Sequence, residues 1–191
     1  MVLDNVDRKI ITKLQQVGRV TFEELGKLVG YTSMGAKKRV NKLLEGKLVN
    51  VSALLNVEAL NLCAAVVFLE MEGAEAMRRL VERFRGCPRV VHIFTTLGGY
   101  NLIALVVAEN QGTLESISVE KCYLRSSEGI RRSEFYPIGN VHYSPFLLVR
   151  EHLTHKELTT TPCGVDCRPC RRFESKDCVG CPATSYYEGY L

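Results

Sequence analysis

Residues 21–44 read TFEELGKLVGYTSMGAKKRVNKLL, and this stretch decides the fold of the N-terminal part of the chain. Thr21 and Glu24 have the spacing of a capping box, in which both side chains bind free N–H groups at the start of a helix. Gly30 is suited to end that helix, because glycine adopts the left-handed conformation of many helix C-termini without strain. The first half of the stretch therefore predicts a short helix between Thr21 and Gly30.

A second helix is expected after the break at residues 30–31. Thr32 or Ser33 can cap it, and its apolar and basic residues fall on opposite faces. The inner face is formed by Ala36, Val40, Leu43 and Leu44, and the outer face by Lys37, Lys38, Arg39 and Lys42. The buried stripe of the preceding helix would be Phe22, Leu25, Leu28 and Val29.

One more helix is predicted between Asp4 and Gly18, because apolar residues recur there at helical spacing. These residues are Val6, Ile10, Ile11 and Leu14. Three short helices with a tight turn before a basic third helix form a helix-turn-helix, whose third helix lies in the major groove of DNA.

The distribution of charge supports this interpretation. Residues 1–50 carry ten Lys/Arg and five Asp/Glu, a net charge of +5, whereas residues 51–139 carry −1 and residues 140–191 are neutral. A basic domain attached to neutral ones indicates that double-stranded DNA is bound at one end. The candidate contacts are Thr32, Ser33, Lys37, Lys38, Arg39 and Lys42. The alternative is a three-helix bundle whose basic face is only solvated.

The hydrophobic period changes after residue 49. Strands are predicted over residues 61–71, 89–97, 100–108 and 130–138, and helices over residues 74–84 and 114–124. The first of these helices would turn Met77, Leu80, Val81 and Phe84 inward. The order βαββαβ is that of a ferredoxin-like α+β sandwich, with a hairpin at Gly98–Gly99.

The predicted organisation has five parts. They are a three-helix winged/helix-turn-helix domain over 1–50, a connecting segment over 51–60, a ferredoxin-like dimerisation and effector domain over 61–139, an extra strand and linker over 140–160, and a cysteine-rich, metal-stapled module over 161–191. No run approaches the ~18 apolar residues that span a bilayer. The first ten residues are charged where a signal peptide would be apolar, so we expect a cytoplasmic protein without membrane contact.

This combination resembles the Lrp/AsnC (leucine-responsive/asparagine-regulatory) family of prokaryotic transcription regulators. The matching stretches are LDNVDRKIITKLQQVGRVTFEELGKLVGYTS, KKRVNKLLEGKLV and TLGGYNLIALVV, within residues 3–139. The resemblance implies a regulator that is not an enzyme. It also implies a homodimer that pairs through the sheets of its regulatory domains and often assembles into tetramers or octamers.

The resemblance further implies a small effector, typically an amino acid, bound between regulatory domains near Gly98, Gly99, Tyr100 and Asn101. Two glycines allow close approach to the backbone, whose N–H groups can receive a carboxylate. The family usually has Asp where this chain has Asn101, so the partner for an ammonium group loses its charge. The alternative is a tight hairpin whose glycines supply positive φ.

An enzymatic alternative is a siroheme decarboxylase, since those enzymes share the two-domain plan and hold a tetrapyrrole in the regulatory fold. The chain offers no clear set of heme ligands, because His92 is the only histidine before residue 142. We interpret His92, in a predicted strand, as a core histidine.

Five cysteines gather near the C-terminus: Cys163, Cys167, Cys170, Cys178 and Cys181. The segment around them has too few aliphatic side chains to offset the ordering entropy of about 30 residues at ~1.5 kcal/mol each, so the thiols must staple it. The last four form two CxxC pairs, which suit tetrahedral zinc, the first choice.

The same thiols can instead hold a 4Fe-4S cluster, because Pro182 after Cys181 is similar to the Cys-Pro ending of ferredoxin motifs. Disulfides or free thiols are the third alternative. Cys163 is expected to be a substitute ligand or a redox partner. The isolated thiols Cys63, Cys87 and Cys122 are interpreted as small buried hydrophobes rather than ligands.

Overall fold

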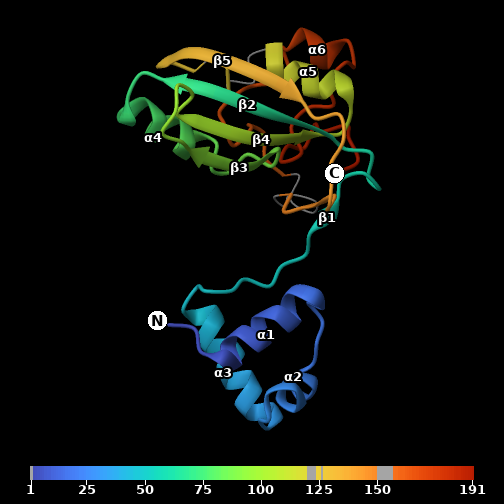
Figure 1. The fold of residues 1–191 in the computed structure, drawn as a ribbon. Coiled ribbons are helices and arrows are strands. Elements are labelled where there is room, and N and C mark those ends of the chain that lie inside the picture. The colour runs from blue at the N-terminus through green and yellow to red at the C-terminus, as the bar shows by residue number, and fades with distance from the viewer. Residues whose placement is uncertain (1, 120–123, 126, 150–156) are drawn as a thin grey trace. The chain divides into compact units, whose positions relative to one another are not determined.

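The computed structural model describes residues 2–119, 124–125, 127–149 and 157–191. The chain divides into two compact units, Met1–Ala53 and Leu54–Leu191. Figure 1 shows the helices of the first unit and the mixed architecture of the second. No helix among the described residues is long and apolar enough to cross a membrane.

The first unit consists of α1 (Asn5–Gln16), α2 (Phe22–Val29) and α3 (Ser33–Glu45). Both α1 and α2 begin with a capping box, formed by Asp4 with Asp7 and by Thr21 with Glu24. Gly30 ends α2 in the left-handed conformation. The predicted helix-turn-helix is therefore confirmed, and no strand that could form a wing occurs in residues 2–53.

The core of this unit is a small cluster from all three helices. It is formed by Ile10, Leu25, Ala36, Val40 and Leu43. Three side chains expected inside are exposed instead, namely Phe22, Leu28 and Leu44. For Phe22 and Leu28 the expectation was wrong because α2 has only eight residues and buries a narrow stripe around Leu25. For Leu44 it was wrong because α3 turns its Ala36, Val40 and Leu43 side inward.

A close approach at the turn also shapes this unit. A Cβ atom on Gly26 would lie 2.6 Å from the carbonyl oxygen of Tyr31. Because real Cβ atoms do not come this close to backbone, glycine at this position allows the chain to fold back tightly between α2 and α3.

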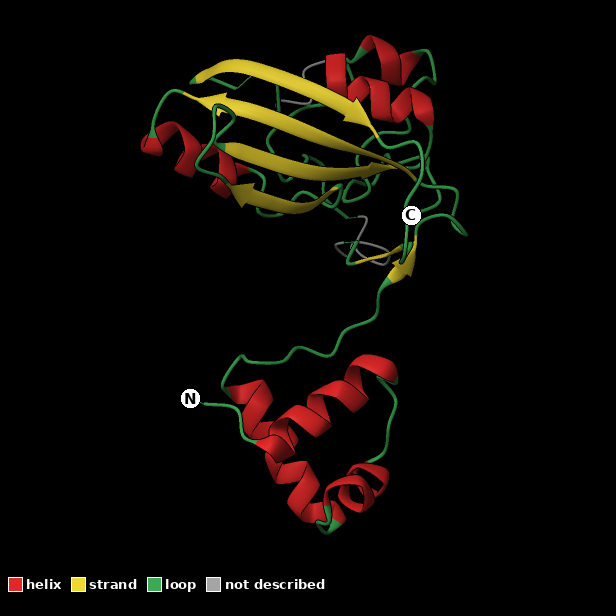
Figure 2. Cartoon of the chain, viewed as in Figure 1, coloured by secondary structure: helices red, strands yellow, loops and turns green. Residues whose placement is uncertain are grey.

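The second unit contains a four-stranded antiparallel sheet. Its strands are β2 (Cys63–Met71), β3 (Val90–Thr95), β4 (Leu102–Ala108) and β5 (Ile130–Pro137), in the order β3-β4-β2-β5. The two helices between strands are α4 (Ala74–Arg83) and α5 (Gln111–Val119). Figure 2 shows the sheet with these helices. The predicted ferredoxin-like βαββαβ order is confirmed.

The main core packs the sheet against both helices. It includes Val67, Leu69, Leu80, Phe84, Leu102, Ala104, Leu114 and Ile117. Val81, expected to point inward, is exposed, because α4 presents its Leu80 side to the sheet. The helix predicted over 114–124 begins three residues earlier, and residues 120–123 lie outside the described part of the chain.

The C-terminal additions belong to this second unit. A short sheet pairs β1 (Leu55–Asn56) with β6 (Phe146–Leu147), which supplies the extra strand expected after residue 140. The tail adds α6 (Arg171–Glu174). Cys163 is a member of the main core, and Val165 packs against it. Residues 161–191 therefore share a core with the regulatory domain.

Candidate functional site

The outer face of α3 carries exposed cations. Lys37, Lys38 and Lys42 are exposed, and the Thr32 hydroxyl caps the helix by accepting a hydrogen bond from the Gly35 N–H at 3.1 Å. Ser33 is the first helical residue and is also exposed. These side chains lie on the helix that a helix-turn-helix inserts into the major groove.

Two further residues lie on the same face and were missed by the sequence analysis. Met34 and Asn41 are exposed, and their spacing from Lys37 and Lys38 places them on one helix face. Asn is a side chain that can bind adenine through two hydrogen bonds. The helical spacing i, i+3, i+4 and i+7 was the signal that could have identified them.

Arg39 has a different role from its lysine neighbours. Its guanidinium pairs with the carboxylate of Asp4, and a second ion pair joins it to Asp7 at 3.3 Å. The Asp7 N–H, more than Arg39, holds the pKa of the Asp4 carboxyl below its usual value. The two ion pairs of Arg39 therefore link α3 to the start of α1.

The hairpin turn between β3 and β4 contains the expected effector residues. The Thr96 N–H donates to the Asn101 carbonyl at 3.0 Å, which closes the turn. Neither Gly98 nor Gly99 has positive φ, so the expected conformational role of these glycines is wrong. A Cβ atom on Gly99 would meet no atom within 4 Å, so the backbone there is open to approach.

The Asn101 side chain is hydrogen-bonded to the backbone of the sheet. Its Nδ2 donates to the Met71 carbonyl at 2.9 Å, and the Met71 N–H donates to its Oδ1 at 2.7 Å. An aspartate could accept the second bond but could not donate the first. This amide therefore joins the start of β4 to the end of β2.

Tyr100 belongs to a cluster on the sheet face opposite the main core. Its hydroxyl donates to Glu134, as does the hydroxyl of Tyr136 at 2.5 Å. The ring of Phe68 lies 5.7 Å and 5.6 Å from these two tyrosine rings. The Tyr100 hydroxyl is the largest cause of the lowered pKa of Glu134, while burial is the main cause that raises the pKa of Tyr100 to about 12.

His92 is also on this sheet face, and the interpretation of it as a core histidine was wrong. It is exposed on β3, with its ring 5.6 Å from the ring of Phe94. The register of β3 shifts between Val90 and His92, so that Val90 and Ile93 face the main core and His92 does not. Such an irregularity breaks the simple alternation of side chains along a strand.

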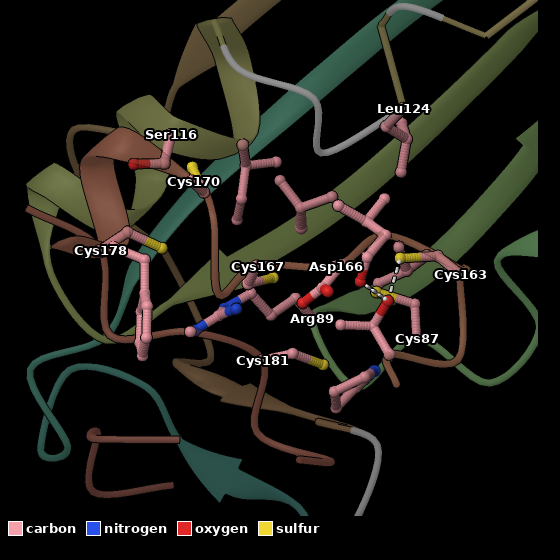
Figure 3. A pocket seen from close by; sticks show the side chains of 18 of the residues that line it. Cys87, Arg89, Ser116, Leu124, Cys163, Asp166, Cys167, Cys170, Cys178 and Cys181 are labelled. Carbon is pink, nitrogen blue, oxygen red and sulfur yellow. Dashed lines mark hydrogen bonds between the residues drawn. The ribbon is translucent and has the colours of Figure 1, made fainter. Parts of the chain in front are cut away.

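The five tail cysteines border one cavity of about 310 Å³. A sixth thiol, Cys87, borders the same cavity and comes from the loop after α4 (Figure 3). Cys87 packs against the main core, as a small hydrophobe would, but it is not isolated from the other thiols as expected. Cys63 is half-buried away from the cavity, and Cys122 lies outside the described residues.

Apolar side chains from both parts of the unit complete the cavity wall. The regulatory domain contributes Phe84, Val90, Val106, Ile117 and Leu124, and the tail contributes Val165 and Phe173. Burial raises the pKa of the Cys87 thiol to about 12 and those of Cys167 and Cys181 to about 11. Within the described ranges, no three His, Cys, Asp or Glu side chains converge closely enough to hold a single metal ion.

Hydrogen-bonded turns hold the thiols at the cavity. The Cys170 N–H donates to the Cys167 carbonyl at 3.0 Å, which closes the first CxxC turn. The Cys178 N–H donates to the Arg172 carbonyl at 2.9 Å, and the Thr184 N–H donates to the Cys181 carbonyl at 3.0 Å.

A buried ion pair anchors the end of the tail. Arg89 binds Glu109 through both guanidinium Nη2 and Nε, with distances of 2.6 Å and 3.2 Å to one carboxylate oxygen. The Tyr187 hydroxyl donates to the other oxygen at 2.5 Å, and the Tyr190 hydroxyl donates to the Glu109 carbonyl at 2.8 Å. The two tail tyrosines therefore attach to the end of β4 through one residue.

Two more contacts join the tail to the helices. The Arg172 Nε donates to the Ser116 hydroxyl at 2.6 Å, and the Arg83 Nε donates to the Cys163 carbonyl at 2.9 Å. A Cβ atom on Gly112 would lie 2.4 Å from the Asp177 carbonyl oxygen. The tail therefore packs tightly against α5 and the end of α4.

Two family models match the chain. The AsnC-type helix-turn-helix domain matches residues 3–44, and the Lrp/AsnC ligand binding domain matches residues 64–139. All five tail cysteines lie beyond both matched ranges.

Relatives and solved structures agree with these matches. The uncharacterized HTH-type transcriptional regulator YezC of Bacillus subtilis is 35% identical over 114 residues, which cover 59% of this chain and 81% of YezC. The HTH-type transcriptional regulator Rv2324 of Mycobacterium tuberculosis is 31% identical over 134 residues, 69% of this chain and 88% of that protein. The structure of the transcriptional regulator NMB0573 of Neisseria meningitidis, in complex with L-Met, aligns with a TM-score of 0.66 and 21% identity. This alignment covers 81% of this chain and 99% of that one.

Proposed function

Since the chain belongs to the Lrp/AsnC family of transcription regulators, we propose that it binds a pseudo-palindromic operator as a homodimer or larger assembly. The observation that carries this proposal is the exposed basic face of α3, the second helix of the helix-turn-helix. Thr32 and Ser33 at its start would donate to phosphate, and Lys37, Lys38 and Lys42 would bind phosphates or base edges.

Changing Lys37, Lys38 and Lys42 together to alanine is expected to weaken binding to any duplex. The logarithm of affinity should also depend less steeply on the logarithm of salt, by about 0.9 for each phosphate that is no longer neutralised, because fewer counterions are released. Fluorescence anisotropy with a labelled random-sequence duplex at several salt concentrations measures both effects. The matched control changes Arg78, Arg79 and Arg85 of the regulatory domain to alanine. If affinity depends equally steeply on salt in the two variants, α3 is not part of the DNA interface.

The sheet face opposite the main core supports a dimer interface. Phe94 and Tyr136 are exposed there, and Phe68 lies between Tyr100 and Tyr136. Exposed aromatic side chains that lie together on one face are typical of protein interfaces. We propose that two regulatory domains pair through this face and that dimers can assemble into tetramers or octamers.

Replacing Phe94 with aspartate is expected to raise the dissociation constant of the dimer by roughly tenfold or more, because a charge would lose its water in the interface. Light scattering of the full chain over a range of concentrations measures this shift toward monomer. Val119→Asp, at an exposed position on α5, is the control. Identical mass profiles for both variants and the unchanged protein would place the interface elsewhere.

The second part of the proposal is a small effector, such as an amino acid, at the β3–β4 turn. The open backbone at Gly99 supports close approach of a carboxylate. The Asn101 side chain is already hydrogen-bonded to the Met71 backbone. The effector would therefore be bound by the backbone of the turn and by Tyr100. We expect at least one amino acid to raise the melting temperature of the regulatory unit, and no shift with all twenty would exclude this effector class.

The third part is a metal centre in the tail, bound by thiolates from Cys163, Cys167, Cys170, Cys178 and Cys181. Zinc and a 4Fe-4S cluster are the two candidate occupants. Their common support is that all five thiols border one cavity. The comparisons do not support the enzymatic alternative, a siroheme decarboxylase, because the matching family models and relatives are those of transcription regulators.

A further inference from the structure

Cys87 reaches the cavity from a part of the chain far from the other five thiols in sequence. Its N–H donates to the Phe84 carbonyl at 3.0 Å, and its carbonyl accepts from the Val90 N–H at 3.3 Å. Phe84 and Val90 are both fully buried in the main core. The fold of the regulatory domain therefore fixes Cys87 at the cavity wall.

Cys163 lies next to Cys87 on one side of the cavity, as Figure 3 shows. The two thiols are close enough for the Cys163 charge to raise the pKa of Cys87, after burial as the larger cause. Cys170 and Cys178 lie on the opposite side in this view, with Cys167 and Cys181 between them. All six cysteines therefore border the same cavity.

The size of this volume distinguishes the two candidate occupants. Zinc binds four thiolates at about 2.3 Å, which brings the sulfurs into contact around a single atom. Here the thiols and apolar side chains enclose about 310 Å³. A body of several atoms, such as a cluster of four irons and four sulfides, fills such a space better than one ion.

The chemistry of the wall also suits a cluster. The apolar side chains of Phe84, Val106, Ile117 and Phe173 line the cavity, and an apolar shell of this kind tunes iron–sulfur centres. A cluster with four thiolate ligands carries net negative charge. The basic side chains that border the cavity are Arg171 and Arg89, and Arg89 is paired there with buried Glu109.

We propose that this cavity binds one 4Fe-4S cluster, and that Cys87 of the regulatory domain supplies one thiolate ligand while cysteines of the tail supply the others. This inference rests on the metal centre proposed above, and it chooses the 4Fe-4S cluster over zinc as the occupant. The cluster joins the tail to the segment between α4 and β3, so its presence acts directly on the domain that pairs the subunits.

The test uses the full chain, purified without oxygen and reconstituted with ferrous iron and sulfide. Iron, acid-labile sulfide and zinc are measured per chain, with the visible spectrum and the electron paramagnetic resonance signal after reduction. We expect about four irons and four sulfides with a broad brown absorption. Cys87→Ser is expected to lose at least half of the iron and to change the resonance signal, whereas Cys63→Ser, the matched control away from the cavity, should match the unchanged protein.

A second measurement uses the unchanged protein, so its result does not depend on whether the Cys87→Ser variant folds. In the unchanged protein, alkylation of Cys87 followed by mass spectrometry should be blocked with the cluster present and should proceed once the cluster is removed. One zinc per chain without sulfide would overturn the cluster, and intact iron in Cys87→Ser would overturn the ligand role of Cys87. DNA binding by the same samples, measured in parallel, separates either failure from failure of the regulatory function.

Discussion

Replacing Glu109 with alanine is expected to destabilise the second unit by about 3–5 kcal/mol, because it would remove the carboxylate that pairs with buried Arg89. The side chain of Glu109 is 0% exposed and that of Arg89 is 8% exposed. The substitution also removes the acceptor of the Tyr187 hydroxyl. Such a loss is a large share of the roughly 5–15 kcal/mol that stabilises a typical domain. Chemical denaturation followed by tyrosine fluorescence measures it, since the chain has no tryptophan.

The matched control for this variant is Glu115→Ala. Glu115 also pairs with an arginine, Arg172, at 3.4 Å, but its side chain is 53% exposed. Exposed pairs contribute about 0–1 kcal/mol, so this variant should unfold nearly like the unchanged protein. If both variants lose equally little stability, the Glu109 pair is not the anchor of the tail.

Local sequence was sufficient for the elements of the fold. The capping residues Asp4, Thr21 and Thr32 each precede a helix, because a cap acts within one turn of its own helix. The βαββαβ order followed from the change in hydrophobic period. The exposure of Val81, by contrast, depends on which side of α4 meets the sheet. The helical period does not distinguish Leu80 from its neighbour Val81 as the residue that faces inward.

Several contacts that the sequence did not indicate are long-range. Arg39 has the same local pattern as Lys38, yet Asp4 and Asp7, at the start of a different helix, bind it. Asn101 is joined to Met71 across the sheet. Cys87 stands alone in the sequence, and only the packing of the tail brings the other thiols to it. The tail thiols were expected together from their short spacing, and they border one cavity.

Removal of the metal centre by a strong chelator is expected to raise the amide hydrogen-exchange rates of the tail many-fold. Metal binding to thiolate sites contributes about 10–16 kcal/mol in small zinc modules, so its loss can exceed the stability of the segment it orders. Because Cys87 is proposed as a ligand from outside the tail, the effect should extend past residues 157–191. We expect faster exchange over residues 84–90 as well, where Cys87 and Arg89 border the cavity.

The first unit provides the internal control for this measurement. Its core is built from Ile10, Leu25, Ala36, Val40 and Leu43, and none of these residues contributes to the cavity. Exchange over residues 2–53 should therefore be unchanged by the chelator. Loosening confined to residues 157–191 would contradict a ligand role for Cys87, because a centre held only by the tail would leave the turn after α4 fixed by Phe84 and Val90. Faster exchange in both segments is the result that a centre shared between tail and regulatory domain requires.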